Sequence, residues 1–192
     1  MHPVTHLLAG WTVANAWPES NPLSMRDRAW IAWAGVIPDL DGLGVVGDIL
    51  TRNRPNPLTW YDDYHHILAH NLAFGVALMV LAWGTSHRRW ATAMGVLISF
   101  HLHLLGDLLG SKGPDGHRWT IAYLYPFTER GLWDWHGQWE LKAWPNTAIS
   151  LALMALAFFW SWKRGRSPVE LFSIRGDKGL TQVLRTRFGD PV

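Results

Sequence analysis

Histidine and aspartate residues interrupt several otherwise apolar stretches of this 192-residue sequence. A buried carboxylate or imidazolium without a partner is costly and usually neutralises by shifting its pKa, whereas a divalent cation supplies the opposite charge. We therefore interpret these clusters as candidate ligands of a metal ion. They are Thr5-His6, Pro38-Asp39-Leu40-Asp41, His65-His66 with His70, and His101 and His103 with Asp107.

The spacing within the clusters predicts which side chains act together. His103 and Asp107 share a helix face at i and i+4 and can bind one ion, or form a ligand with its supporting carboxylate. His66 and His70 share a face by the same rule, whereas His101 points elsewhere. A histidine and an aspartate at this spacing inside a membrane would also suit a proton relay. The pattern alone leaves both roles open.

Two aspartates, Asp39 and Asp41, flank one leucine directly after a proline. An extended backbone at this point would present both carboxylates to one pocket. The same pattern is common at a helix terminus. It indicates a binding site only if the other histidine and aspartate clusters lie nearby.

Five stretches have the apolar periodicity and the end signals of helices. Pro3 fits a first helical turn, and Ser24 is a good N-cap for a helix that Pro38 stops. The sequence predicts an all-α fold, an up-and-down bundle of about five helices with a long loop, residues 111–146, before the last helix. The expected helices cover residues 3–16, 24–37, 65–85, 91–109 and 147–162, and residues 51–63 form a loop.

Short connections between these helices would bring the clusters to one end of the bundle. If the second hairpin turns near Arg88, His70 lies 18 residues before the turn and Asp107 lies 19 residues after it. Both then sit roughly 27 Å from the turn, at about 1.5 Å of rise per residue. His6 and Asp39 converge at the same end from the first hairpin. Convergence, more than any single motif, favours a binding site.

Composition limits the class of protein. The length suits one compact domain, residues 1–165, followed by a peripheral polar tail, residues 166–192. Only 17% of residues are charged and 14 are tryptophan, which favours a membrane protein. There is no cysteine, so a metal must be held by nitrogen and oxygen ligands. A formal charge of +2 without a basic stripe argues against nucleic-acid binding.

Three stretches, residues 67–83, 91–109 and 147–162, approach membrane-spanning length, although the last is marginal. No basic region precedes an apolar run at the N-terminus, so we expect no removable signal peptide. The basic turns would lie on one side of the membrane, which the positive-inside rule makes cytoplasmic, and the histidine and aspartate clusters would face the periplasm. These turns carry Arg26 and Arg28, Arg88 and Arg89, and Lys163 and Arg164.

Several further residues accompany the clusters in a fixed order: Thr5-His6, Ile37-Pro38-Asp39-Leu40-Asp41, His65, His70-Asn71, His103-Leu104-Leu105-Gly106-Asp107, Gly113 and Leu124-Tyr125-Pro126-Phe127. In this order and spacing, about residues 4–162 resemble the bacterial membrane-bound metal-dependent hydrolases, the YdjM-like family. That family is similar, more distantly, to zinc-dependent phospholipase C and single-strand nucleases, all-helical enzymes that hydrolyse phosphoesters with zinc ions.

The resemblance implies a metal site in a multi-pass protein of the bacterial inner membrane. The sequence departs from the family at His66 and Ala69, where the family usually has arginine and threonine. The assignment of His65 or His66 as the ligand therefore stays open. The implied metal ligands are His6, Asp39, His65, His70, His103 and Asp107.

We expect a membrane-bound hydrolase with a divalent metal, zinc with one to three ions, that lowers the pKa of a bound water toward about 7. Asp41 or His66 would orient or deprotonate that water. The expected substrate is a phosphoester or lipid-like molecule, with a phospholipid headgroup as the natural choice, and membrane lipid is the expected partner. Tryptophans of the loop at residues 111–146 would anchor it at the interface or contact the substrate.

Two rival interpretations remain open. In the first, a membrane protein holds a structural metal or conducts protons or ions without turnover; a structural site would be closed to water. In the second, a soluble helical hydrolase lies on the membrane surface.

Overall fold

The computed structural model describes residues 1–191 apart from 114–115 and 129, and this part of the chain contains eight α-helices and two 3-10 helices. Its only strand-like pairs are two isolated bridges, Lys112 with Glu140 and Ile121 with Trp133. The all-α prediction is confirmed. The elements are α1 (Pro3–Asn15), α2 (Met25–Ala34), η1 (Ile37–Leu43), α3 (Gly44–Thr51), α4 (Trp60–Tyr64), α5 (Leu72–Thr85), α6 (Arg89–Gly110), α7 (Trp144–Arg164), η2 (Pro168–Leu171) and α8 (Ile174–Phe188).

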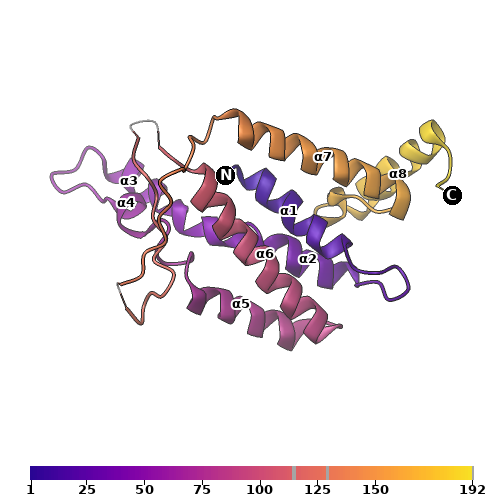
Figure 1. Ribbon diagram of the computed structural model, residues 1–192, viewed down its shortest axis with the longest axis horizontal. Helices are drawn as coiled ribbons and strands as arrows, with labels where there is room; N and C mark the ends of the chain where they lie inside the picture. The colour runs from indigo at the N-terminus through magenta and orange to yellow at the C-terminus, as the bar shows by residue number, and fades with distance from the viewer. Residues whose placement is uncertain (114–115, 129, 192) are drawn as a thin grey trace.

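Helix α6 forms the centre of the bundle and packs against α1, α2 and α5, while α1 also contacts α2 and α7 (Figure 1). The core between these helices includes the fully buried Phe100 and Leu104 of α6 and Ile31 of α2. Gly10 lets α1 approach this closely, because a Cβ there would lie 2.6 Å from Ser99 Oγ. The tight packing fixes α6 as a rigid support for the side chains at its C-terminal end.

The second expected helix ends four residues before Pro38. Ser24 begins it as predicted, with a capping box in which its hydroxyl accepts from the Asp27 backbone N–H. Helix α2 ends at Ala34, and the chain then changes to the 3-10 helix η1, where the Asp39 N–H donates to Val36 O rather than to Gly35 O. Pro38 lies inside η1. The change redirects the chain and leaves the Gly35 carbonyl free.

The third expected helix begins seven residues later than predicted, at Leu72. Asn71 caps α5 by accepting from the Phe74 N–H, and residues 65–71 before it form turns and bends. His66 has φ +68°, a left-handed conformation that excludes a right-handed helix at that residue. The prediction that His66 and His70 share a helix face is therefore wrong.

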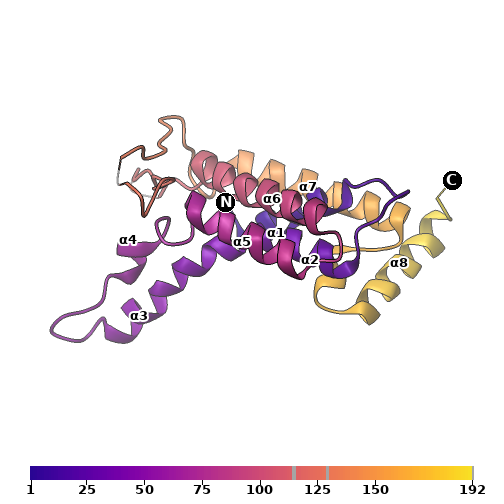
Figure 2. The same cartoon turned by 90° about the horizontal axis from the view of Figure 1, so that it is seen from below.

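Helices α3 and α4 form an arm that projects from the bundle (Figure 2). The sequence predicted neither helix, because residues 51–63 carry two prolines and Gly44 and Gly47 weaken helix propensity. The glycines are instead packing positions, since a Cβ on either would lie 2.9 Å from an atom of Trp60. The arm therefore has a specific internal packing.

Helices α6 and α7 match their predicted ranges within a few residues, and the described residues between them, 111–113, 116–128 and 130–143, contain no helix. The C-terminal segment forms η2 and α8. Glu170 of η2 is buried, accepts from Arg28 Nε at 2.8 Å and accepts from Trp11 Nε1 at 3.1 Å. The segment thus joins α1 and α2 at the end of the bundle opposite the arm (Figure 1).

Among the described helices, length and composition suit only α6 for crossing a membrane by itself. Helix α2 together with η1 and α3 also qualifies as one broken span, bent by 49°. Helix α5, with 14 residues, is shorter than a span requires. The structure therefore supports one or two candidate spans, fewer than the three stretches expected from sequence.

Candidate metal centre

Four side chains from three segments converge at the end of α6. Asp39 of η1, His70 from the turns before α5, and His103 and Asp107 of α6 each offer one ligand atom, and these atoms lie within 4.8 Å of one another. His103 Nε2 is 3.0 Å from both His70 Nε2 and Asp107 Oδ2, and 3.7 Å from Asp39 Oδ1. The convergence predicted from helix rise and short connections is therefore present.

Hydrogen bonds on the far side of each imidazole determine where its lone pair points. His103 Nδ1 donates to the Gly35 carbonyl at 2.9 Å, and His70 Nδ1 donates to Asp41 Oδ2 at 2.9 Å. In the neutral rings both Nε2 atoms then carry lone pairs that face each other. An outer carbonyl or carboxylate of this kind is the usual support of a metal-bound histidine.

The carboxylates add further acceptors to the same space. Asp107 Oδ2 and Asp39 Oδ2 are buried and have no hydrogen-bond partner within the described residues. The other oxygen of Asp107 accepts from Ser111 Oγ at 2.9 Å and from the amino group of Met1. Two imidazole nitrogens and two carboxylates thus form an N2O2 donor set that suits zinc or another divalent ion.

The charge around His70 agrees with a site that attracts cations. Burial alone would lower the pKa of His70, but the carboxylates of Asp107 and Asp41 outweigh this effect and raise the pKa to about 9. A proton on His70 Nε2 can serve His103 Nε2 at 3.0 Å or Asp107 Oδ2 at 3.6 Å, and it leaves Asp39 Oδ2 unpaired. One proton is therefore a poorer match to the site than a doubly charged ion.

Asp41 lies behind His70, away from the four converging atoms. Its two oxygens accept from His65 Nδ1 at 2.7 Å, from His70 Nδ1 and from the Ala69 N–H at 3.2 Å. In a 3-10 helix, residues two apart point about 240° apart, so Asp39 and Asp41 face different partners. The expectation of an extended dipeptide with both carboxylates in one pocket is wrong.

His65 lies on the outer side of Asp41 and forms a second group with Asp41 and His70. Its ring stacks on Tyr61, with ring centroids 4.6 Å apart. His6 contacts the main group from α1, because its Nε2 is 3.2 Å from Asp107 Oδ1 and its ring lies 4.0 Å from that of His103. His6 and His65 therefore lie next to the group of Asp39, His70, His103 and Asp107 but are not members of it.

His66 is the neighbouring imidazole that faces the cavity. It is buried, its Nδ1 has no hydrogen-bond partner within the described residues, and its ring lies 4.5 Å from that of His70 and 5.1 Å from that of Trp119. Burial and the nearby His70 lower the pKa of His66 well below its ordinary value. A neutral imidazole with a free nitrogen can accept a proton.

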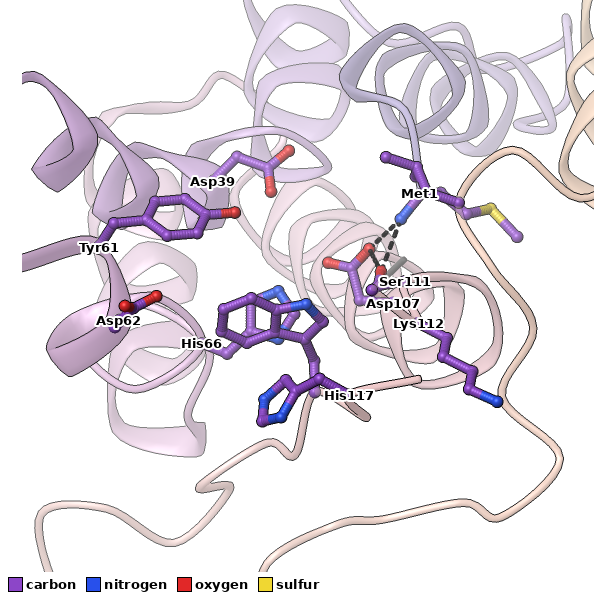
Figure 3. A pocket seen from close by; sticks show the side chains of 12 residues that line it. Met1, Asp39, Tyr61, Asp62, His66, Asp107, Ser111, Lys112 and His117 are labelled. Carbon is purple, nitrogen blue, oxygen red and sulfur yellow. Dashed lines mark hydrogen bonds and ion pairs between the residues drawn. The ribbon is translucent and has the colours of Figure 1, made fainter. Parts of the chain in front are cut away.

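A pocket of about 670 Å³ opens onto this group of residues (Figure 3). Its wall includes Asp39, Asp107 and His66, and Tyr61 of α4 stands opposite Asp107. Basic and aromatic side chains from the segment after α6 close the other side: Lys112, His117 and Trp119. The centre is therefore reachable from outside through an anion-compatible rim.

The sequence identified the converging residues but missed others that shape the site. His117 lines the pocket, although it belongs to none of the clusters marked by the sequence. Tyr61 lies in a segment expected to be a loop, and the Gly35 carbonyl gives no signal in a residue pattern. Ser111, at i+4 from Asp107, was detectable from helix periodicity. His101 points elsewhere as predicted and contacts Tyr123 O–H at 2.9 Å.

One family model matches residues 1–174, and its description is YdjM inner membrane protein. The match covers every residue of the centre and of the pocket. No curated protein and no solved structure matches the chain significantly.

Proposed function

Because the chain belongs to the YdjM inner membrane protein family, we propose that it is a membrane-bound, metal-dependent hydrolase of phosphoesters. One observation carries the proposal: the ligand atoms of Asp39, His70, His103 and Asp107 converge, with unpaired carboxylate oxygens, at an open pocket. A purely structural site would be closed, whereas a catalytic site keeps access for water and substrate.

A divalent ion at this centre would acidify a bound water and polarise the scissile phosphoryl oxygen. Side chains of the protein would supply proton transfer and would position the histidines. His66, neutral and directed at the pocket, would act as the general base, while Asp41 positions His70 and His65 from behind. This arrangement favours His66 over Asp41 for proton transfer, because the Asp41 oxygens are already occupied.

The rim of the pocket suits a phosphoester more than a neutral ester. Lys112 and His117 can meet the negative charge of a phosphate group. Burial and the nearby carboxylates, Asp39 first among them, raise the pKa of Tyr61, so its hydroxyl stays protonated and can donate to a phosphate oxygen. A phospholipid headgroup combines this charge with the membrane location of the family.

The exposed surface of α6 supports membrane embedding. Its outward stripe is apolar, whereas its inward face carries His103 and Asp107. Helix α6 therefore exposes apolar side chains and buries His103 and Asp107 beside the core residues Phe100 and Leu104, whereas the exposed face of a soluble helix is polar. The stripe consists of Trp90, Met94, Ile98, Leu102 and Leu105, at helical spacing.

We further propose that the centre faces the periplasm. The basic residues Arg88 and Arg89 lie at the start of α6, and Lys163, Arg164 and Arg166 lie at the end of α7 and just after it, at the helix ends opposite the metal centre. The positive-inside rule assigns that end to the cytoplasm.

The test is to purify the full chain in mild detergent and measure bound metal together with hydrolysis of phosphatidylglycerol. Wild type should carry metal and turn over lipid, Asp39→Ala should lose both, and His66→Gln should keep the metal but lose turnover. Asp63→Asn is the matched control, since Asp63 is exposed and pairs only with Thr59 Oγ1.

Metal-free but folded wild-type protein would refute the proposal. Bound metal without turnover of any phosphoester would favour a structural or ion-conducting role instead. A His66→Gln variant with an unchanged rate and pH profile would remove His66 from the mechanism while leaving the metal centre intact.

A further inference from the structure

The arm formed by α3 and α4 is amphipathic, and none of the residues that the structure describes covers the apolar side of α3. Helix α3 contains no buried residue. Its outer face carries Val46, Ile49 and Leu50, of which Leu50 is 74% exposed, and the exposed Leu43 at the end of η1 precedes it. A patch of this kind on an arm that projects from the bundle marks an interaction surface (Figure 2).

The inner face of α3 satisfies the polar groups of the arm. Asp48 accepts from the N–H groups of Trp60 and Tyr61 at 2.7 and 3.0 Å, which caps α4. Thr51 Oγ1 donates to Gly47 O at 2.8 Å and accepts from the Leu58 N–H at 2.9 Å. Since these polar side chains turn inward, the outer face of α3 is purely apolar.

We propose that α3 inserts this outer face into the lipid bilayer and that the arm forms the wall along which a lipid phosphoester enters the pocket. The lipid-entry part rests on the proposed function; the insertion itself does not. A helix with a polar side satisfied within the protein and an apolar side left open is suited to lie in the interfacial region of a membrane.

Three further observations favour lipid as the occupant. Helices α2 and α3 qualify together as one broken membrane span, so the apolar face of α3 continues a candidate membrane segment. Arg52 and Arg54 follow α3 in the connection to α4, where they can meet phosphate headgroups, and Trp60 is partly exposed at the base of α4. The family consists of inner membrane proteins.

The arm is also a wall of the pocket. Tyr61 and Asp62 of α4 line the cavity that contains Asp39 and Asp107 (Figure 3). A lipid whose acyl chains rest beside α3 would therefore present its headgroup to the metal centre without leaving the membrane. Insertion of the arm would place the mouth of the pocket at the membrane, and this position suits a lipid phosphoester as the substrate.

The absence of cysteine from the sequence makes insertion directly measurable. Full-length Leu50→Cys and Val46→Cys, labelled with an environment-sensitive NBD probe, are reconstituted in vesicles of phosphatidylethanolamine and phosphatidylglycerol. We expect blue-shifted emission that lipids with spin-labelled acyl chains quench. Asn56→Cys, exposed in the polar connection of the same arm and beyond the two arginines, is the matched control and should show the emission of a probe in water.

Water-like emission at Leu50 and Val46 would overturn the proposal. Blue-shifted emission without quenching by the labelled lipids would also overturn it, since a second protein surface would then cover α3. Neither readout requires turnover, so insertion is tested even if the hydrolase proposal fails.

The entry route is tested with Ile49→Ser combined with Leu50→Ser. Loss of two exposed aliphatic side chains that would contact lipid should lower turnover of phosphatidylglycerol in vesicles by at least about tenfold. Turnover of a short-chain, water-soluble phosphodiester should stay unchanged, because neither residue lines the pocket. Equal loss with both substrates, or no loss with either, would refute lipid entry along the arm.

Discussion

Both ends of the bundle bury acidic side chains, but the two ends treat them differently. At the end near η2, Glu170 accepts from Nε and Nη2 of the Arg28 guanidinium and from Trp11 Nε1. Asp27 likewise accepts from the backbone N–H groups of Ser24 and His87. Each of these buried acids has donors for both oxygens.

At the metal centre, the carboxylates of Asp39 and Asp107 each keep an oxygen without a partner among the described residues. Two imidazole nitrogens approach to 3.0 Å with no backbone donor between them. The presence or absence of donors for both carboxylate oxygens distinguishes two roles of a buried acid. Saturated acids stabilise the fold, and acids left open beside facing imidazoles are available to bind a cation.

The largest effect on stability is expected at the saturated end. Glu170→Gln leaves the buried Arg28 charge uncompensated and should lower the free energy of unfolding by about 3–5 kcal/mol. Thermal unfolding in detergent measures the loss, and the metal content of the surviving folded fraction should equal that of wild type. A variant as stable as wild type would contradict the structural role given to this pair.

The corresponding change at the open end should act on metal binding. Asp107→Asn removes one ligand oxygen and should weaken zinc binding by more than about 100-fold, measured by competition with a chelating dye. It should also lower the stability of the metal-free protein modestly, because the Asp107 carboxylate accepts from Ser111 Oγ and from the Met1 amino group. Normal zinc affinity in this variant would show that the ion binds elsewhere.

A smaller effect on zinc affinity is expected at Asp41, which supports His70 from behind. Asp41→Asn cannot accept from His65, His70 and Ala69 as the carboxylate does, so His70 loses its fixed orientation. We expect about 10- to 100-fold weaker zinc binding in the same assay. An effect as large as that of Asp107→Asn would instead make Asp41 a direct ligand of the second group.

The smallest predicted change in the free energy of unfolding tests the hydrogen bond between Trp11 and Glu170. Trp11→Phe removes one hydrogen bond to Glu170 and keeps the Arg28 pair, so it should cost about 1 kcal/mol of unfolding free energy. Chemical unfolding compared with wild type measures it. A loss as large as that of Glu170→Gln would mean that Trp11 contributes mainly through packing.

The sequence predicted those parts of the molecule that depend on periodicity and spacing. Helices α1, α6 and α7 follow apolar repeats with clear ends, and the meeting of His70 with Asp107 follows from helix rise. The errors lie where tertiary contacts override local preference. Asn71 begins α5 later than hydropathy indicates, and Trp60 stabilises α3 through two glycines that weaken a helix in isolation.

The orientation of the ligands depended on information that no residue pattern contains. The left-handed backbone of His66 and the 3-10 turn at Asp39 decide which way those side chains face. The residue types therefore predicted which side chains converge at the centre. The tertiary structure was needed to show which of them face one another and which lie behind.

The end of α2 also governs the chemistry of α6. The Asp39 N–H pairs with Val36 O, and so the carbonyl oxygen of Gly35 is released to select one tautomer of His103. A mutation that prolonged α2 by a single turn would reclaim that oxygen for the helix and let the imidazole proton migrate to the other nitrogen. The candidate metal centre would then lose the Nε2 lone pair of His103 through a change of backbone geometry that replaces none of its side chains.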